Sequence, residues 1–240
     1  MVERLLQKIS QSDVLIVHGS GLHEFEIGPT GWWPGNPEAP LPKPDPDGRM
    51  RETALIQAWQ MALKELYVKP IIVAGGNVFK DLAPSTGFIV KENLKRRGKI
   101  PDDSIYLAEG GNTVADMQEV ERVMRENDWR TSIHISSGYH RVLETLCGIQ
   151  GREFIPAEDL LEMRNKRYQK IVNALLVSQD RKNAIRAQER KAWIVRIPFI
   201  GEKIYDFLVK RKLSQGIKST PFNRLALLEM VGKPKEPVVK

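Results

Sequence analysis

The 240-residue sequence has a single cysteine, Cys147, and little that could cross a membrane. One cysteine excludes an internal disulfide framework and metal sites built on several thiolates, and it is typical of a reducing compartment. The first apolar run, Val14–Val17, is far shorter than the ~20 residues that span a bilayer. Met1–Ser12 is too polar for a secretory signal. We therefore expect a cytoplasmic protein with Cys147 in its core.

The last third of the sequence has few acidic residues. Residues 1–159 hold 18 Lys and Arg against 23 Asp and Glu, a net charge of −5, whereas residues 160–240 hold 19 against 7, a net charge of +12. A segregated basic segment indicates a polyanionic partner, either an anionic membrane surface or nucleic acid. The alternative is a basic helical segment that packs on the acidic body.

Short apolar runs alternate with helical patterns between residues 13 and 156. The expected strands are Asp13–His18, Pro70–Ala74, Asp103–Ala108, Ser132–Ser136 and Glu153–Pro156. The expected helices are Arg49–Tyr67, Ser85–Arg97, Val114–Glu126 and Tyr139–Ile149. This alternation predicts an α/β fold, a three-layer, Rossmann-like open sheet, mostly parallel, in residues 1–157. Residues 158–240 are predicted to form a basic helical C-terminal extension.

Polar, glycine-rich turns follow four of the expected strands. Right-handed crossovers bring the carboxyl ends of parallel strands to one edge, where open sheets bind ligands. The turns at this edge are Gly19-Ser20-Gly21, Gly75-Gly76-Asn77, Glu109 with Asn112-Thr113, and Ser136-Ser137-Gly138-Tyr139 with His140 and Arg141. We expect their glycine-rich backbones to donate N–H groups to a small anionic ligand, either nucleotide-derived or phosphate-bearing.

Four charged or titratable side chains could act on such a ligand. Arg51 could hold a carboxylate or phosphate bidentately, with Arg141 as a second cation; a surface salt bridge is the alternative for Arg51. His140 is the first candidate for acid–base catalysis, since only histidine has an ordinary pKa near neutrality, although lone histidines are more often structural. Glu109 is the second candidate; it could also bind a ribose hydroxyl, hold Arg51, or cap the next helix.

Three other chemistries have weaker support. Ser20 could be a nucleophile with His140 as its base, but its surroundings lack the Gly-x-Ser-x-Gly elbow. His18 and His23 could bind a metal with an aspartate of the following loop, but their spacing matches no familiar ligand pattern, and we predict no metal. The glycine turns do not complete a Gly-x-Gly-x-x-Gly motif, so a standard dinucleotide site is not expected.

The segment Leu22–Gly48 is a long, proline-rich loop. Its seven prolines exclude a regular helix or a central strand, and it contains the adjacent pair Trp32-Trp33. Long loops in compact domains are often lids or binding loops. We predict that this loop closes over the ligand pocket; the alternative is that the two rings cap the core from outside.

An apolar segment framed by basic residues lies at residues 190–212. Its apolar residues could lie on a lipid surface with Lys and Arg toward the headgroups, and Pro198 and Gly201 divide it into two pieces. The alternative function is therefore that of a non-catalytic peripheral membrane protein, at the inner face of the membrane. Nucleic acid is a less probable partner, because aromatic and basic residues are not interleaved on any strand.

The order and spacing of these turns resemble those of the YdcF/SanA/ElyC-like family, bacterial α/β proteins long catalogued as a domain of unknown function. The resemblance covers residues 13–156. Its matching pieces are Val17–Gly21, Arg51–Ala54, Ala74–Gly76, Ser85, Gly98 before Ile100–Asp102, Glu109 with Asn112-Thr113, and Ser137–His140. It departs from the family pattern at Thr86, Ala115, Asp116 and Leu143. The resemblance implies a Rossmann-like fold and a ligand pocket at the carboxyl edge that includes Ser85. The cofactor stays open: one member's affinity for S-adenosylmethionine makes that molecule a candidate, and other members are linked to cell-envelope metabolism.

Overall fold

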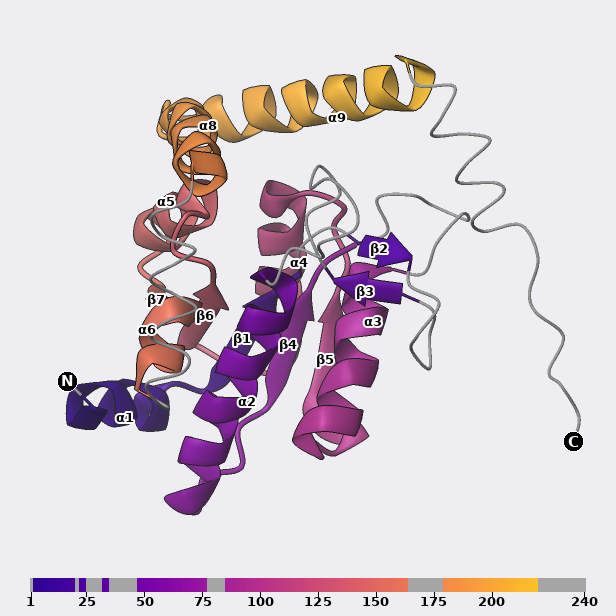
Figure 1. The fold of residues 1–240 in the computed structure, drawn as a ribbon. Helices are drawn as coiled ribbons and strands as arrows, with labels where there is room; N and C mark the ends of the chain where they lie inside the picture. The colour runs from indigo at the N-terminus through magenta and orange to yellow at the C-terminus, as the bar shows by residue number, and fades with distance from the viewer. Residues whose placement is uncertain are drawn as a thin grey trace, which may run out of the picture.

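The protein is built on a five-stranded sheet in the order β5-β4-β1-β6-β7, and every pair in it is parallel (Figure 1). A computed structural model describes residues 2–19, 22–24, 32–34, 47–76, 85–163 and 179–219. The strands are β1 (Val14–His18), β4 (Ile71–Ala74), β5 (Ile105–Ala108), β6 (Ser132–Ser136) and β7 (Glu153–Pro156). The predicted α/β class and Rossmann-like sheet are thereby confirmed.

Helices cover both faces of this sheet and complete the three layers (Figure 1). Their bounds are α1 (Val2–Gln11), α2 (Asp47–Lys64), α3 (Thr86–Asn93), α4 (Thr113–Glu126), α5 (Arg141–Ile149), α6 (Ala157–Glu162), α8 (Gln179–Val195) and α9 (Gly201–Ser219). The core on one face is shared with α1, α2, α3 and α6. The core on the other face is shared with α4 and α5.

Side-chain alternation along β1 explains why both faces must be covered. Leu15 and Val17 join the core under α2, whereas Val14 and Ile16 join the core under α4. All four side chains are fully buried. A strand that is apolar on both faces is stable only between two helical layers, which is the arrangement found for all-parallel sheets.

Two segments before α2 differ from the sequence-based expectation. Val2–Gln11 forms α1, an amphipathic helix that buries Ile9 against the sheet, although no element was predicted there. Within the proline-rich loop, β2 (Leu22–Glu24) and β3 (Trp32–Pro34) pair antiparallel as a separate two-stranded ribbon. Among the described residues this ribbon pairs only with itself, in agreement with the expectation that the proline-rich segment forms no central strand. The rest of Leu22–Gly48 up to Pro46 lies outside the described residues.

The C-terminal extension packs on the body through α8 and α9. Ala192 and Val195 of α8 and Tyr205 of α9 share a core with α4 and α5, which includes the buried Cys147. The break predicted at Pro198 and Gly201 is confirmed, because α8 ends at Val195 and α9 begins at Gly201. Of the described helices, none is both long and apolar enough to span a membrane.

Candidate functional site

The strand order places a topological switch point between the carboxyl ends of β1 and β6, which is where open α/β sheets have their crevice. The chain runs from β1 to β4 and β5 on one side, and then returns to β6 on the other side of β1. Connections that leave in opposite directions separate the two loops at this switch point, and ligands of open α/β sheets bind there. The loops concerned begin at Gly19, after β1, and at Ser137, after β6.

Arg51 spans this crevice from the first turns of α2. Its side chain is buried, and its Nε donates to Ser137 Oγ at 2.8 Å. One terminal nitrogen donates to the carbonyl oxygens of His18 at 3.1 Å and Gly19 at 3.0 Å. The other lies 3.4 Å from the Tyr139 hydroxyl. The planar guanidinium therefore links the β1 loop to the β6 loop, as a forked donor can and a point charge cannot.

His140 stands beside this cluster at the start of α5. Its Nδ1 lies 3.1 Å from Ser136 Oγ, and its Nε2 lies 3.3 Å from Thr113 Oγ1 of α4. Both ring nitrogens thus face a hydroxyl, which can donate to or accept from either tautomer. The residue is only half-buried. Of the residues expected beside His140, Ser136 contacts its ring, and Thr113, expected at the same edge of the sheet, contacts the other ring nitrogen.

A second pair of histidines lies beneath this surface, and the sequence did not indicate it as a pair. His18 Nε2 and His134 Nδ1 are 2.9 Å apart, and the two rings stack with their centroids 5.2 Å apart. Burial lowers the pKa of His18 well below its ordinary value, with His134, His140 and Arg51 adding to the effect. Burial also lowers the pKa of His134 to about 3. Both rings are therefore neutral at physiological pH.

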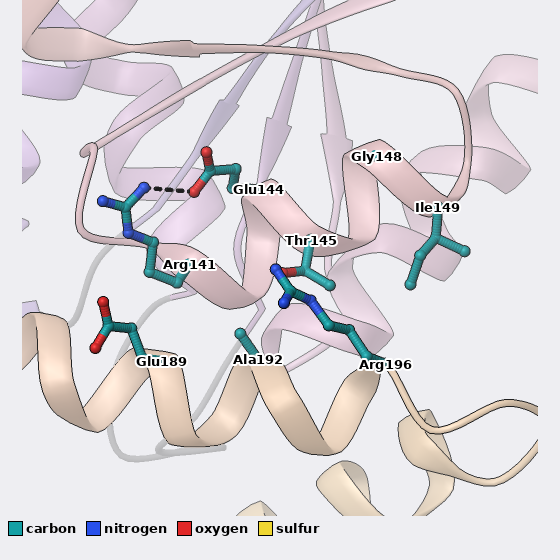
Figure 2. A pocket seen from close by; sticks show the side chains of 8 residues that line it. All are labelled: Arg141, Glu144, Thr145, Gly148, Ile149, Glu189, Ala192 and Arg196. Carbon is teal, nitrogen blue, oxygen red and sulfur yellow. Dashed lines mark hydrogen bonds and ion pairs between the residues drawn. The ribbon is translucent and has the colours of Figure 1, made fainter.

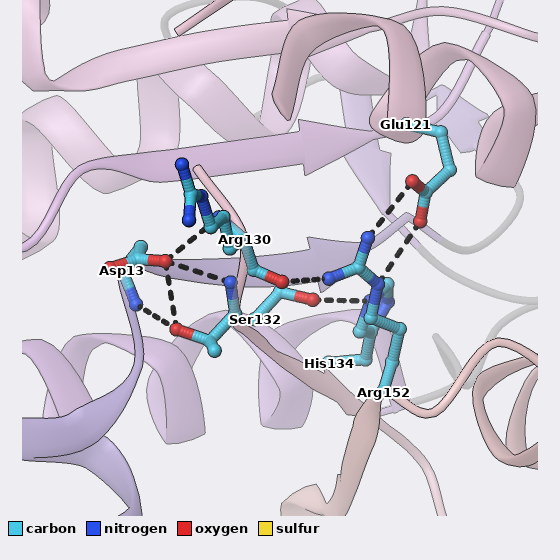
Figure 3. Close-up of polar contacts among 7 residues, drawn as sticks. Asp13, Glu121, Arg130, Ser132, His134 and Arg152 are labelled. Carbon is cyan, nitrogen blue, oxygen red and sulfur yellow. Dashed lines mark hydrogen bonds and ion pairs between the residues drawn. The ribbon is translucent and has the colours of Figure 1, made fainter. Parts of the chain in front are cut away.

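Figure 3 shows what fixes the far side of His134. Its Nε2 lies 3.1 Å from Ser132 Oγ. Nearby, Arg152 makes two hydrogen bonds with Glu121, at 3.1 and 2.9 Å, and donates to the Arg130 carbonyl. The positive charge of Arg152 also contributes to the lowered pKa of His134. The His18 ring hydrogen-bonds with His134 in this buried network, which argues against the metal site considered from the sequence. Within the described ranges no group of three metal-ligating side chains occurs.

The glycine turns do not offer the donors that were expected of them, and this expectation was wrong. Each described glycine of the expected cradle donates its N–H within the protein. The acceptors are the Ala74 carbonyl for Gly19, the Ala108 carbonyl for Gly75, the Asp116 carboxylate for Gly76 and the Glu158 carboxylate for Gly138. These described glycines therefore do not contribute free N–H groups to an anion site.

Close packing explains why glycine occupies these turns. A Cβ on Gly19 would lie 2.4 Å from Thr86 Cγ2, and one on Gly76 would lie 2.2 Å from the backbone nitrogen of Gly111. Neither distance is compatible with a side chain. The turns after β1, β4 and β5 are thus pressed against one another, and their glycines permit that approach.

Glu109 is placed away from Arg51. It directly follows β5 and accepts a hydrogen bond from Ser85. The Ser85 hydroxyl also caps α3 by accepting from Phe88 N–H at 3.0 Å. Since β4 lies between β5 and β1, the ends of these two strands are about 10 Å apart. The structure therefore does not join Glu109 to Arg51, which was one of the roles considered for it. Glu109 and Ser85 form a separate contact at the edge of the sheet.

Asn112 and Thr113 connect the site to the extension. Asn112 caps α4, as one of the two predicted alternatives, by accepting from Val114 N–H at 3.0 Å and Ala115 N–H at 3.1 Å. Its amide also donates to Asp206 of α9 at 2.8 Å. The Thr113 hydroxyl hydrogen-bonds with Tyr205 of α9. The contribution of α9 to this edge was not predicted, because nothing in a basic helical pattern indicates where the helix docks.

Arg141 makes its ion pair outside the Arg51 cluster. It pairs with Glu144 at 2.6 Å on the outer side of α5 and lines a groove between α5 and α8 (Figure 2). This groove has a volume of about 620 Å³ and includes Glu189 of α8 and Arg196, which directly follows α8. Arg141 therefore does not serve as the second cation of the crevice. Ser20, Gly21 and Asn77, also expected at the site, lie outside the described residues.

Comparisons with protein-family models, with curated proteins and with solved structures found no match.

Proposed function

We propose that this protein binds a small anionic molecule, nucleotide-derived or phosphate-bearing, in the crevice between the carboxyl ends of β1 and β6. The observation that carries the proposal is the position of Arg51, a buried guanidinium held at the switch point of the sheet by both crevice loops. A cation fixed in advance loses little conformational entropy when an anion arrives.

Tyr139 defines the side of the guanidinium from which a ligand would approach. Its hydroxyl makes the longest of the contacts, at 3.4 Å, and the residue is half-buried whereas Ser137 is buried. The ligand would contact this outer edge, with the phenol as a further donor. Arg51 then contributes charge-assisted hydrogen bonds, which are stronger than those between neutral groups.

If the bound molecule reacts, His140 is the residue for proton transfer. It is half-buried at the same edge, and Ser136 and Thr113 hold its two nitrogens. His18 and His134 are unsuited to this role, because burial lowers the pKa of both and the two rings bond to each other. Glu109 is distant from the crevice and is not assigned a part in it.

S-adenosylmethionine is one candidate of this ligand class, and the resemblance to the YdcF/SanA/ElyC-like family supports including it. Its carboxylate is the part for which Arg51 is a suitable partner. Glu109 lies two strands away, and the Glu158 carboxylate beside the β6 loop accepts from the Gly138 N–H, so neither is assigned to a ribose. A phosphate-bearing molecule fits the same donors equally well, so both belong in one screen.

Thermal-shift screening against nucleotides, S-adenosylmethionine and cell-wall precursors tests the proposal, with calorimetric titration of any hit. Arg51→Lys keeps the charge but loses the fork, and should weaken binding by roughly 10–100-fold. His140→Gln keeps a hydrogen-bonding side chain but cannot transfer protons. Arg122→Lys is the matched control, because Arg122 forms exposed ion pairs with its own helix.

The result that contradicts the proposal is specific. A ligand whose affinity is unchanged in the Arg51→Lys/His140→Gln double variant binds somewhere else. Each variant is first compared with wild type for its own melting temperature without ligand, so that loss of binding is separated from loss of folding. No shift with any probe would contradict the ligand class.

A further inference from the structure

The elbow between α8 and α9 presents a cluster of exposed apolar side chains. Phe199 is 99% exposed, Trp193 68%, Phe207 62% and Ile200 52%. We propose that this elbow docks the protein on an anionic lipid bilayer. The proposal does not depend on the ligand crevice, and it concerns residues that the proposed function does not use.

The opposite side of the same helices is fixed to the body. Ala192, Val195 and Tyr205 are buried in the core shared with α4 and α5. Gly201 allows the tight turn, since a Cβ there would lie 2.3 Å from the Ile194 carbonyl oxygen. The exposed rings therefore project from a rigid support, and packing of the extension on the body leaves them accessible.

Phe199 has an unusual backbone conformation for its side chain. Its φ of 64° lies in the left-handed region, which favours glycine and asparagine over a bulky residue. The strain is not offset by burial of the ring, because the ring is almost fully exposed. Residues held in such conformations cluster at sites of function. A membrane-inserting tip would give this exposed ring an apolar environment.

The charge around the elbow favours anionic lipid as the partner. Residues 179–219 contain 11 Lys and Arg against 4 Asp and Glu. Arg190, Arg196 and Lys203 lie exposed beside the apolar cluster. Basic residues around an apolar face are the pattern of helices that lie in the interface of anionic membranes.

A second exposed apolar loop allows a comparison. Leu66 is 92% exposed and has the same φ of 64°, but it lies between α2 and β4, at the opposite edge of the sheet. Its neighbours Lys64 and Glu65 cancel in charge, and Lys69 donates to the Ser10 and Ser12 carbonyls. Exposure alone therefore does not single out a lipid surface. Of these two loops, the elbow is the one that combines exposed apolar side chains with an excess of basic charge.

Vesicle sedimentation tests the proposal with the full-length chain. The probes are phosphatidylcholine vesicles with and without about one-third phosphatidylglycerol, at low and high salt. Wild type should bind the anionic vesicles, and more weakly at high salt. Phe199→Asn removes the ring while suiting the left-handed backbone, and should reduce partitioning about tenfold or more. Arg196→Gln and Lys203→Gln should each reduce it about fivefold.

Leu66→Asn is the matched control, because it makes the same change at the same backbone conformation on the other edge; it should bind like wild type. Failure of wild type to bind anionic vesicles overturns the proposal. So does an equal loss in Phe199→Asn and Leu66→Asn, or no loss in either. If gel filtration instead reveals an oligomer that Phe199→Asn abolishes, without vesicle binding, the elbow is an interface between copies and lipid is excluded.

Discussion

Asp116 is the residue whose replacement should change stability most clearly with pH. Its carboxylate lies at the start of α4 and accepts hydrogen bonds from Gly110 N–H at 2.9 Å and Gly111 N–H at 3.1 Å. Burial outweighs these hydrogen bonds and raises the pKa of Asp116 from 3.8 to about 7, with the nearby Glu109 adding to the shift. The carboxyl group is thus half-protonated near neutral pH in the folded protein.

The sign of the effect follows from proton linkage. A carboxyl group with a higher pKa in the folded state binds protons more tightly there than in the unfolded chain. Its contribution to stability is complete below pH 3.8 and is lost as pH rises through about 7. A shift of about 3 units corresponds to ~4 kcal/mol at most. Since the residue keeps partial contact with solvent, we expect about half of this.

Asp116→Asn removes the titration and retains an oxygen that can accept from Gly110 and Gly111. Urea unfolding of both proteins between pH 5 and pH 8.5 gives the difference in their free energies of unfolding. We expect the variant to gain stability relative to wild type as pH rises, until the difference levels off above pH 7. The lowered pKa values of His18 and His134 make the folded protein less stable as pH falls. Both histidines are present in wild type and variant, so their effect cancels in the difference between the two free energies of unfolding. A difference that stays constant across this range would refute the reasoning.

Two further predictions concern glycine packing and the tryptophan pair. Gly110→Ala should lower the free energy of unfolding by about 3 kcal/mol, because the new Cβ would lie 2.1 Å from the Ala115 carbonyl carbon. Gly148 occupies an open position in α5, so Gly148→Ala should raise the free energy of unfolding by roughly 0.5–1 kcal/mol. Chemical denaturation measures both changes. If the proline-rich loop is a lid, ligand binding should change tryptophan emission in wild type and not in Trp32→Ala/Trp33→Ala; a signal that persists in the double variant would contradict the lid.

The elements of the sheet could be predicted because their apolar patterns are local. Ser132–Ser136 and Glu153–Pro156 are found with the predicted bounds, and the other three strands begin within two residues of theirs. The strand order could not be predicted, because it depends on which crossover follows which. That order decides the site: Arg51 meets Ser137 only because β6 lies beside β1. Residues that are 86 apart in sequence gave no sign of this contact.

The glycine turns show where motif reasoning fails. A glycine-rich turn at a strand end indicates that backbone comes close to something, but not what approaches it. Here the approaching group is another part of the chain: Gly76 packs against Gly111, and the Gly138 N–H donates to Glu158. Acceptors such as Asp116 and Glu158 lie in the following helices, and sequence spacing could not show that they would occupy the donors.

The pairing of His18 with His134 was also beyond sequence reasoning, although each residue had a signal. Both occupy positions whose neighbours in the strand face the α2 side, so both must face α4 and α5. Register places them on adjacent strands, with His134 beside Ile16. Two buried imidazoles can lie in contact on one face because both are neutral. Their contact could be predicted only if the register of β1 against β6 were known.

The C-terminal extension can both pack on the body and dock on lipid, because the two use different residues. From the sequence, packing on the acidic body and docking on lipid were treated as alternatives. In the structure, packing uses Ala192, Val195 and Tyr205, while Trp193 and Phe199 remain exposed on the same helices. Packing therefore does not remove the docking surface. Tyr205 of α9 hydrogen-bonds with Thr113, and Thr113 contacts His140. Helix α9 therefore connects the elbow with the edge of the crevice. A bilayer bound at the elbow would lie on the crevice side of the sheet (Figure 1).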